Sequence, residues 1–253
     1  MATSDSSLTD ADGRFVVDPR KAANGLDDPL SEPVGAYSTI SAALSVAPAD
    51  ATIMVRPGAY VEQLMITRPV RLLADAGAEL TWKSDKPYEA ALTVAIADSQ
   101  PAGDVLVSGL RISHSSPSIA QNYAVYVPQP SSASADKARI EIRDCDVSSA
   151  TGSGVGVEGG DVTLARCRIA NCKNHGVSFL GPTARGAVLD CTIEKAKLNG
   201  VLLRDGASPT LRGNRLRSNG QFGAALFDCR GTLEDNEASG NGKGSVSGEC
   251  DDF

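Results

Sequence analysis

A repeat of about 23 residues, running from Ala138 to the C-terminus, constrains the fold of this chain more than any other feature. The repeat becomes visible when the chain is aligned on five positions that are 22, 24, 23 and 22 residues apart, namely Cys145, Cys167, Cys191, Asn214 and Asn236. Apolar or small residues recur two positions after these five residues and three positions before them. A period of this length without a helix-forming interior predicts a parallel β-solenoid. We expect each coil to contain a strand, a turn, a second strand and a second turn.

The strand pattern begins near Ala51, and the chain accommodates about eight coils. Ahead of this pattern, Ser38 can cap a short helix that Pro48 ends and whose apolar residues share one face: Ile40, Ala43, Leu44 and Ala47. Such a helix would cover the first coil, whose strand edges would otherwise leave unpaired backbone groups. The sequence therefore predicts an all-β domain over residues 37–253 with a short N-terminal capping helix. Residues 1–36 are expected to form a tail and a lead-in loop.

Composition and charge narrow the class of protein. The 25 glycines, 13 prolines and 4% aromatic residues suit a thin core built from aliphatic ladders. A net charge of -7 and an isoelectric point near 4.9 make nucleic acid an unsuitable partner. No apolar run approaches 18 residues, and the first twelve residues lack the hydrophobic region of a signal peptide. We expect a soluble chain outside the membrane, either cytoplasmic or a mature chain whose leader has been removed.

The six cysteines and two histidines predict neither a metal site nor a cofactor. They form no CxxC motif and no Cys/His cluster with the spacing of a metal site. Three cysteines occupy the repeat position that asparagine takes in the next two coils, so they are expected to pack as small buried side chains. Cys229 and Cys250 fall on adjacent coils at a separation of about 5 Å, which would permit a disulfide. In a reducing compartment we expect free thiols.

An insertion interrupts the repeat before its regular part. Leu110 aligns with Cys145, yet 35 residues separate them, about a dozen more than one coil requires. The excess lies in residues 113–122 and 128–136. Insertions in a solenoid map to turns on one side, where they often wall a binding groove.

Two stretches of the chain resemble known β-helix proteins. The residues Tyr37-Ser-Thr-Ile-Ser-Ala-Ala-Leu, followed by Ala-Thr-Ile-Met-Val-Arg-Pro-Gly-Ala-Tyr-Val-Glu at 51–62, resemble the opening of right-handed parallel β-helix proteins of the pectin-lyase-like family. That group includes pectin methylesterases, periplasmic copper-maturation proteins, and the β-helix domains of F-box and spindle-associated proteins. Residues 206–214 and 231–237 look most like the non-catalytic β-helix repeats of the F-box and spindle-associated proteins. The resemblance implies a right-handed helix and a recognition surface.

The chain departs from the enzymes of that family where they carry their chemistry. It lacks the Gln-Asp dipeptide, the Asp-Phe-Ile-Phe-Gly segment and the late Gly-Arg-Pro-Trp of pectin methylesterases. The Arg-x-Pro-x-x-Arg stretch of pectate lyases and the Asp-Pro-His-Asp pattern of mannuronan epimerases are absent as well. These departures favour recognition without catalysis.

Acidic side chains supply the candidate catalytic group. Most outward carboxylates have a cation on the next coil, so they are expected to form ordinary surface ion pairs. Asp205 and Asp228 instead fall at the same position of adjacent coils, with Arg204 and Arg230 near by. Such a pair could act as the acid and the nucleophile of a hydrolase. The structural alternative is two exposed turn residues that satisfy the local backbone.

The histidines are weaker candidates for catalysis. His175 precedes a repeat glycine, which makes it a turn residue first and a general base second. No partner for His114 is evident from the sequence.

Four aromatic residues of the irregular middle coils form the candidate ligand-binding group: Trp82, Tyr88, Tyr123 and Tyr126. Tyr126 is expected to point outward because its neighbours Val125 and Val127 point inward. Aromatic faces can grip sugar rings on a shallow surface. Against this, Trp82 shares the parity of an inward leucine and could fill the core.

The function predicted from the sequence is non-catalytic recognition of a protein partner or an extended glycan along one face. The first alternative is a polysaccharide hydrolase, lyase or epimerase that uses Asp205, Asp228 and Arg204. The second is a scaffold in a larger assembly. The last coil, from Gly240 onward, contains few apolar residues, so end-to-end association through it is possible and the oligomeric state stays open.

Overall fold

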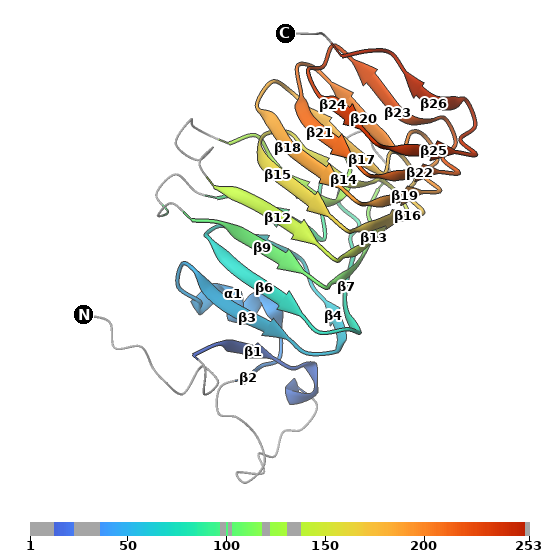
Figure 1. Ribbon diagram of the computed structural model, residues 1–253. Coiled ribbons are helices and arrows are strands. Elements are labelled where there is room, and N and C mark those ends of the chain that lie inside the picture. The colour runs from blue at the N-terminus through green and yellow to red at the C-terminus, as the bar shows by residue number, and fades with distance from the viewer. Residues whose placement is uncertain are drawn as a thin grey trace.

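The computed structural model describes residues 13–22, 36–96, 100, 103–117, 122–130 and 138–250. Within them, three parallel sheets wind into a right-handed β-helix (Figure 1). This confirms the predicted fold class. It also confirms the predicted count of about eight coils, since two of the three sheets, called B and C below, have eight strands each. Each complete coil passes through sheets A, B and C in turn, so it contains three strands. The predicted two strands per coil were wrong, because the aligned Cys/Asn position is itself a tight bend that divides one long extended segment into two strands.

Sheet A is the longest sheet. It consists, in spatial order, of β2 (Ala36–Tyr37), β1 (Phe15–Val17), β3 (Ala51–Val55), β6 (Val70–Ala74), β9 (Val105–Ser108), β12 (Arg139–Arg143), β15 (Gly160–Ala165), β18 (Ala184–Leu189), β21 (Ser208–Arg212) and β24 (Thr232–Glu234). The short strand β1, which precedes the predicted domain boundary at residue 37, pairs in parallel with β3.

Sheets B and C complete the coils. Sheet B consists of β4 (Gly58–Val61), β7 (Ala78–Lys83), β10 (Arg111–Ser115), β13 (Asp146–Ser149), β16 (Arg168–Ala170), β19 (Thr192–Glu194), β22 (Arg215–Arg217) and β25 (Glu237–Ser239). Sheet C consists of β5 (Leu64–Ile66), β8 (Leu92–Val94), β11 (Tyr123–Val127), β14 (Ser153–Val157), β17 (Val177–Leu180), β20 (Val201–Arg204), β23 (Phe222–Phe227) and β26 (Gly244–Ser247).

A ladder of small side chains fixes the register at the bend between sheets A and B, as predicted. The Cys191 N–H donates to Asn214 Oδ1 at 2.9 Å, and the Asn214 N–H donates to Asn236 Oδ1 at 3.0 Å. Cys145 and Cys167 continue the ladder as buried free thiols. A hydrogen bond with Cys167 and burial raise the pKa of the Cys145 thiol, which keeps it protonated. The cysteines are therefore packing residues of the bend.

A second ladder, which the sequence reasoning missed, supports the bend between sheets B and C. The Ala196 N–H donates to Asn219 Oδ1 at 3.1 Å, and Asn219 Nδ2 donates to Asn241 Oδ1 at 3.0 Å. The 22-residue spacing of the two asparagines was the signal that could have revealed it.

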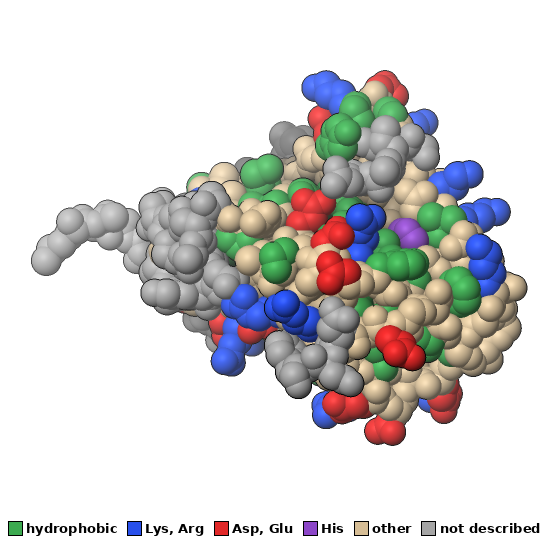
Figure 2. Space-filling model, turned by 90° about the horizontal axis from the view of Figure 1, so that it is seen from above, with side chains coloured by type: hydrophobic (Ala, Val, Ile, Leu, Met, Phe, Trp, Pro, Cys, Tyr) green, Lys and Arg blue, Asp and Glu red, His purple; other side chains and the backbone are tan. Residues whose placement is uncertain are grey.

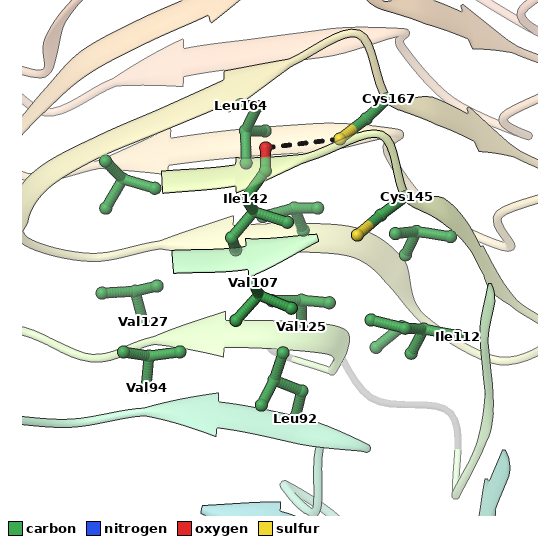
Figure 3. Close-up of a cluster of buried hydrophobic side chains, with 14 of the residues drawn as sticks. Leu92, Val94, Val107, Ile112, Val125, Val127, Ile142, Cys145, Leu164 and Cys167 are labelled. Atoms are coloured by element: carbon green, nitrogen blue, oxygen red, sulfur yellow. Dashed lines mark hydrogen bonds between the residues drawn. The ribbon is translucent and has the colours of Figure 1, made fainter. Parts of the chain in front are cut away.

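Aliphatic side chains from the three sheets fill the interior. Figure 3 shows Leu92, Val107, Val125 and Ile142 in one cluster, next to the Cys145 and Cys167 side chains. The dashed line in that view joins Cys167 Sγ to the carbonyl oxygen of Ile142, which accepts its hydrogen bond at 3.4 Å. Every coil thus adds one layer to a continuous narrow core.

The N-terminal end of the β-helix is covered by helix α1 (Ile40–Val46), and a 3-10 turn, η2 (Pro19–Ala22), precedes β2. The helix buries Ile40, Ala43 and Leu44, as expected. Its cap is Thr39, which accepts the Ala42 N–H, and not the predicted Ser38. Glu62 accepts two further backbone N–H groups of the first turn, at 2.8 and 2.9 Å, so the helix is tied to the first coil.

The C-terminal coil is thinly packed, as its composition predicted. Val246 is 46% exposed, and Leu233 and Ala238 are half-buried. A disulfide joins Cys229 to Cys250 across a Cα separation of 4.6 Å. The predicted placement of these two cysteines on adjacent coils, at a separation that permits a disulfide, is confirmed. The free thiols expected in a reducing compartment stay a prediction. Among the described residues, no helix has the length and apolar character that crossing a membrane requires.

Candidate functional site

One row of side chains on sheet C points outward, and the size of these side chains differs from coil to coil. Tyr126 on β11 pairs with Gly156 on β14, which pairs with Ser178 on β17, followed by Leu202 and Ala225. Val125 and its equivalents point inward, so the predicted outward direction of Tyr126 is confirmed. Because small residues follow the tyrosine, this face is hollowed. The sheet C hollow has a volume of about 480 Å³ and is lined by Tyr123, Gln129, Ser153, Glu158, His175, Ser178, Leu180, Gly181, Leu202, Arg204 and Asp205.

A stacked pair of tyrosines forms one end of the hollow. The rings of Tyr123 and Tyr126 lie 5.2 Å apart with an interplanar angle of 14°. Gly156 makes room for this pair, since a Cβ at that position would lie 2.4 Å from ring atoms of Tyr123. Tyr88, which is 67% exposed, lines a smaller cavity of about 90 Å³ together with both tyrosines and Glu158. Three of the four predicted aromatic residues are thus brought together.

Glu158 connects the tyrosine cavity with the larger hollow. Tyr126 donates its hydroxyl hydrogen to Glu158 Oε2 at 2.6 Å. Burial, followed by the nearby Glu158 carboxylate, raises the pKa of both Tyr123 and Tyr126. Both tyrosines are therefore neutral hydrogen-bond donors at physiological pH. The sequence reasoning did not single out Glu158, because its row continues with Leu180 and Arg204 and shows no acidic repeat.

His175 lines the hollow as a neutral imidazole. Burial lowers its pKa to about 4. Its Nδ1 accepts the backbone N–H of Asn199 at 3.3 Å, which assigns the ring hydrogen to Nε2. The backbone N–H of His175 donates in turn to Ser153 Oγ at 3.2 Å. His175 is thus a member of a polar ladder at the start of sheet C and can offer one donor to a ligand.

The predicted catalytic trio is only partly assembled. Arg204 Nε donates to Asp205 Oδ2 at 2.8 Å, and both residues line the hollow. Asp228 occupies the same position one coil later, but it is not among the described residues that line the hollow. Both aspartates are exposed and have positive φ angles, 59° for Asp205 and 46° for Asp228. These angles are typical of turn residues, which is the structural alternative for this pair.

Trp82 and His114 lie on sheet B, away from the sheet C hollow. Trp82 is on β7 of sheet B, where it packs against the hydrophobic core, so it does not join the three tyrosines. His114 is buried next to it in register. It contacts Ser149 Oγ and the Glu89 carbonyl oxygen, each at 2.9 Å, so it has the partners that the sequence did not reveal.

The surface has other hollows, but their chemistry differs. A larger one, of about 700 Å³, lies on the outer face of sheet A and is lined by no aromatic residue among those described. An apolar one of about 250 Å³ lies where sheet C turns into sheet A, around Val94, Val127 and Ile140. Unlike these two hollows, the sheet C hollow and its tyrosine cavity combine aromatic rings with convergent polar groups. Figure 2 shows a face of the molecule on which acidic, basic, histidine and apolar side chains lie side by side.

The described residues offer no metal site, since no three His, Cys, Asp or Glu side chains among them are grouped to hold an ion. Residues 113–122 and 128–136 were predicted to border the groove, and Gln129 of the second stretch lines the sheet C hollow. Residues 118–121 and 131–137 lie outside the described residues.

Comparisons with known proteins agree with the fold. The family model for the right handed beta helix region matches residues 96–252. Pectin methylesterase from Aspergillus niger is similar in structure, with a TM-score of 0.57 and 16% sequence identity over 95% of this chain and 91% of that one. Pectin methylesterase from carrot has a TM-score of 0.54 and 12% identity over 92% and 88% of the two chains. No curated protein sequence matches the chain.

Proposed function

The chain belongs to the right-handed β-helix family, and on that premise we propose that it binds an extended glycan along the outer face of sheet C without catalysing a reaction on it. The single observation that carries the proposal is the tyrosine cavity, in which Tyr88, Tyr123 and Tyr126 adjoin the polar lining of the sheet C hollow. The exposed ring of Tyr88, beside the half-buried Tyr126 and the buried Tyr123, can cover the apolar face of a sugar ring. Hydroxyl, amide and carboxylate groups of the lining can bind the sugar hydroxyls.

The shape of the site favours an extended ligand over a compact one. The lining residues come from β11, β14, β17 and β20, which are neighbours in sheet C. Because neighbouring strands are about 4.8 Å apart, the site extends over roughly 15 Å along the helix axis. A linear glycan can follow the coils and place successive sugar units on successive strands.

The fold relatives support a glycan as the ligand over a protein partner. The pectin methylesterases from Aspergillus niger and carrot, which have a similar fold, act on pectin, a polysaccharide. The resemblance of residues 206–214 and 231–237 to non-catalytic β-helix repeats supports recognition without turnover.

A second candidate is an enzyme that acts on a polysaccharide. One observation favours it: Glu158, His175 and the Arg204–Asp205 pair line the same hollow and could supply an acid, a donor and a cation. This group replaces the predicted pair of Asp205 and Asp228, which the hollow does not bring together.

Isothermal titration calorimetry with linear oligosaccharides tests the proposal. We expect binding by the wild type, and a loss of at least about tenfold in affinity for Tyr88→Ala, because the most exposed ring of the cavity is removed. Arg111→Ala on sheet B is the control and should bind like the wild type. Absence of binding to a broad oligosaccharide panel would refute the proposal, and product formation from any member of that panel would establish the enzymatic candidate.

A further inference from the structure

The charged groups in the sheet C hollow indicate which class of glycan it can bind. Glu158, His175, Arg204 and Asp205 are the described lining residues whose side chains belong to the types that can carry a charge at or just below neutral pH. Arg204 and Asp205 form an ion pair with each other, and His175 is neutral because burial lowers its pKa to about 4. Glu158 interacts with the neutral hydroxyl of Tyr126. Among the described lining residues, Glu158 is therefore the carboxylate that forms no ion pair with an opposite charge.

The position of Glu158 makes this charge effective. It lines both the tyrosine cavity and the larger hollow, so a sugar that stacks on the tyrosines lies next to the carboxylate. Arg204 is two strands further along sheet C, so its backbone is about 10 Å from that of Glu158 at the usual strand spacing, and its side chain donates to its own carboxylate partner, Asp205. A second carboxylate brought in by a ligand would meet like charge in a partly desolvated site.

We propose that the sheet C hollow selects neutral, hydroxyl-bearing glycans and rejects uronates, and that Glu158 is the residue that makes this selection. The inference rests on the proposed glycan binding and adds the class of ligand. A carboxylate accepts hydrogen bonds from sugar hydroxyls, and Oε2 of Glu158 is already held in place by Tyr126. Neutral units gain this interaction, whereas a uronate unit would place its own carboxylate against it.

The test uses three pairs of β-1,4- or α-1,4-linked tetrasaccharides that differ only in oxidation at C6: glucose and glucuronate, mannose and mannuronate, and galactose and galacturonate. Calorimetry with the full chain at low ionic strength should show that, within any pair that binds, the neutral member binds at least about tenfold more tightly. The preference should shrink at 0.5 M salt, because screening weakens the repulsion.

Glu158→Gln identifies the residue, since glutamine can still accept the Tyr126 hydrogen bond but carries no charge. We expect the preference for the neutral member to fall to less than about threefold. Glu79→Gln, on the outer face of sheet B and paired with Arg111, is the matched control and should keep the wild-type preference. Circular dichroism confirms that both variants fold.

The outcomes separate the two proposals. If no tetrasaccharide of either kind binds, the glycan-binding function fails. If the uronate members bind as tightly as the neutral ones or more tightly, glycan binding stands and the selection is refuted. A preference for neutral members that Glu158→Gln leaves unchanged would refute the assignment to Glu158.

Discussion

The outer faces of sheets B and C are made by the same coils, and yet they present opposite kinds of surface. On sheet B, charges of alternating sign occupy neighbouring coils and neutralise one another, in the pairs Glu79–Arg111, Asp146–Arg168, Glu194–Arg168, Glu194–Arg217 and Arg215–Glu237. On sheet C, small side chains next to tyrosines leave a hollow whose polar groups converge. A solenoid makes every residue a neighbour of its equivalent one coil away. In a row of alternating charges, each side chain therefore forms an ion pair with a neighbour in the protein. In a row of large and small side chains, a hollow forms whose polar groups can bind a ligand.

The buried ladders set the register of the coils, and therefore of both outer faces. Removing one ladder residue should have the largest effect on stability. Asn214→Ala removes the acceptor of the Cys191 N–H and the donor to the Val188 carbonyl oxygen, at a fully buried position. We expect a loss of about 3 kcal/mol in the free energy of unfolding, measured with urea, because two buried backbone groups lose their partners.

Two variants sharpen that measurement. Asn214→Cys should lose less, since cysteine fills the equivalent position in the preceding coil. Asn236→Ala, at a half-buried position, should also lose less because water can reach the freed groups. A loss below about 1 kcal/mol for Asn214→Ala would show that the ladder does not set the register.

The second effect concerns sheet C alone. Gly156→Ala adds a Cβ that meets three ring atoms of Tyr123, including Cγ at 2.6 Å, so the whole ring must shift and the stacked pair must separate. We expect oligosaccharide affinity to fall about tenfold, which is about 1.4 kcal/mol. The near-ultraviolet circular dichroism of the tyrosines should change as well. An unchanged tyrosine signal would mean that the pair adapts and that Gly156 does not shape the site.

The third effect concerns sheet B alone. Glu194 has a side chain that is 8% exposed and accepts hydrogen bonds from Arg168 and Arg217 at 2.6 and 2.8 Å. Burial tends to raise the pKa of Glu194, but the two arginines outweigh it, and the pKa lies below its usual value. The stabilisation is therefore present above the unfolded-state pKa and is lost as the pH falls through the folded-state pKa.

Glu194→Ala should cost about 1 kcal/mol at pH 7, since the two arginines are half-exposed and remain solvated. Most of this difference from the wild type should disappear in acid. Oligosaccharide affinity should stay unchanged. A fall in affinity would show that the two faces are coupled.

The fold could be predicted because the same kinds of residue recur at equivalent positions of successive coils. The aligned cysteines and asparagines mark a bend that holds small or amide side chains in five successive coils, so their spacing reveals the register directly. The number of strands per coil was missed because the same bend interrupts the extended backbone without a turn sequence of its own. The cap at Thr39 was missed by one residue, since Ser38 and Thr39 are both suitable cap residues and tertiary contacts with Glu62 decide between them.

The candidate site could be predicted only in part. Tyr126 lies between inward Val125 and Val127, so its outward direction could be predicted from the alternation. Tyr123 has the parity of those valines, so its stacking on Tyr126 could not be predicted. Tyr88 reaches the pair through a loop in the preceding coil. Trp82 is separated from them because it belongs to sheet B, a distinction that a reading with two strands per coil could not make. Glu158 and His175 are single members of rows whose other members differ in chemistry. Their role depends on neighbours across coils, and no repeat marks it.

The smallest effect tests whether the hollow keeps its histidine neutral, in contrast to the fully charged face of sheet B. Burial lowers the pKa of His175 to about 4, so the unfolded chain binds a proton near pH 6.5 that the folded chain does not. Because the folded state holds His175 neutral, its contribution to the free energy of unfolding is greatest at high pH. This contribution falls as the pH decreases from about 6.5 toward 4. Between pH 7 and pH 6 the wild type should lose about 0.7 kcal/mol from this source. His175→Asn, which repeats the residue found at Asn199 one coil later, should lack this loss, while His114 contributes equally to both proteins. Urea unfolding of the two proteins at pH 7 and pH 6 gives the difference directly. Equal changes in both would mean that His175 titrates normally, and the hollow would then gain a positive charge near pH 6 that balances Glu158.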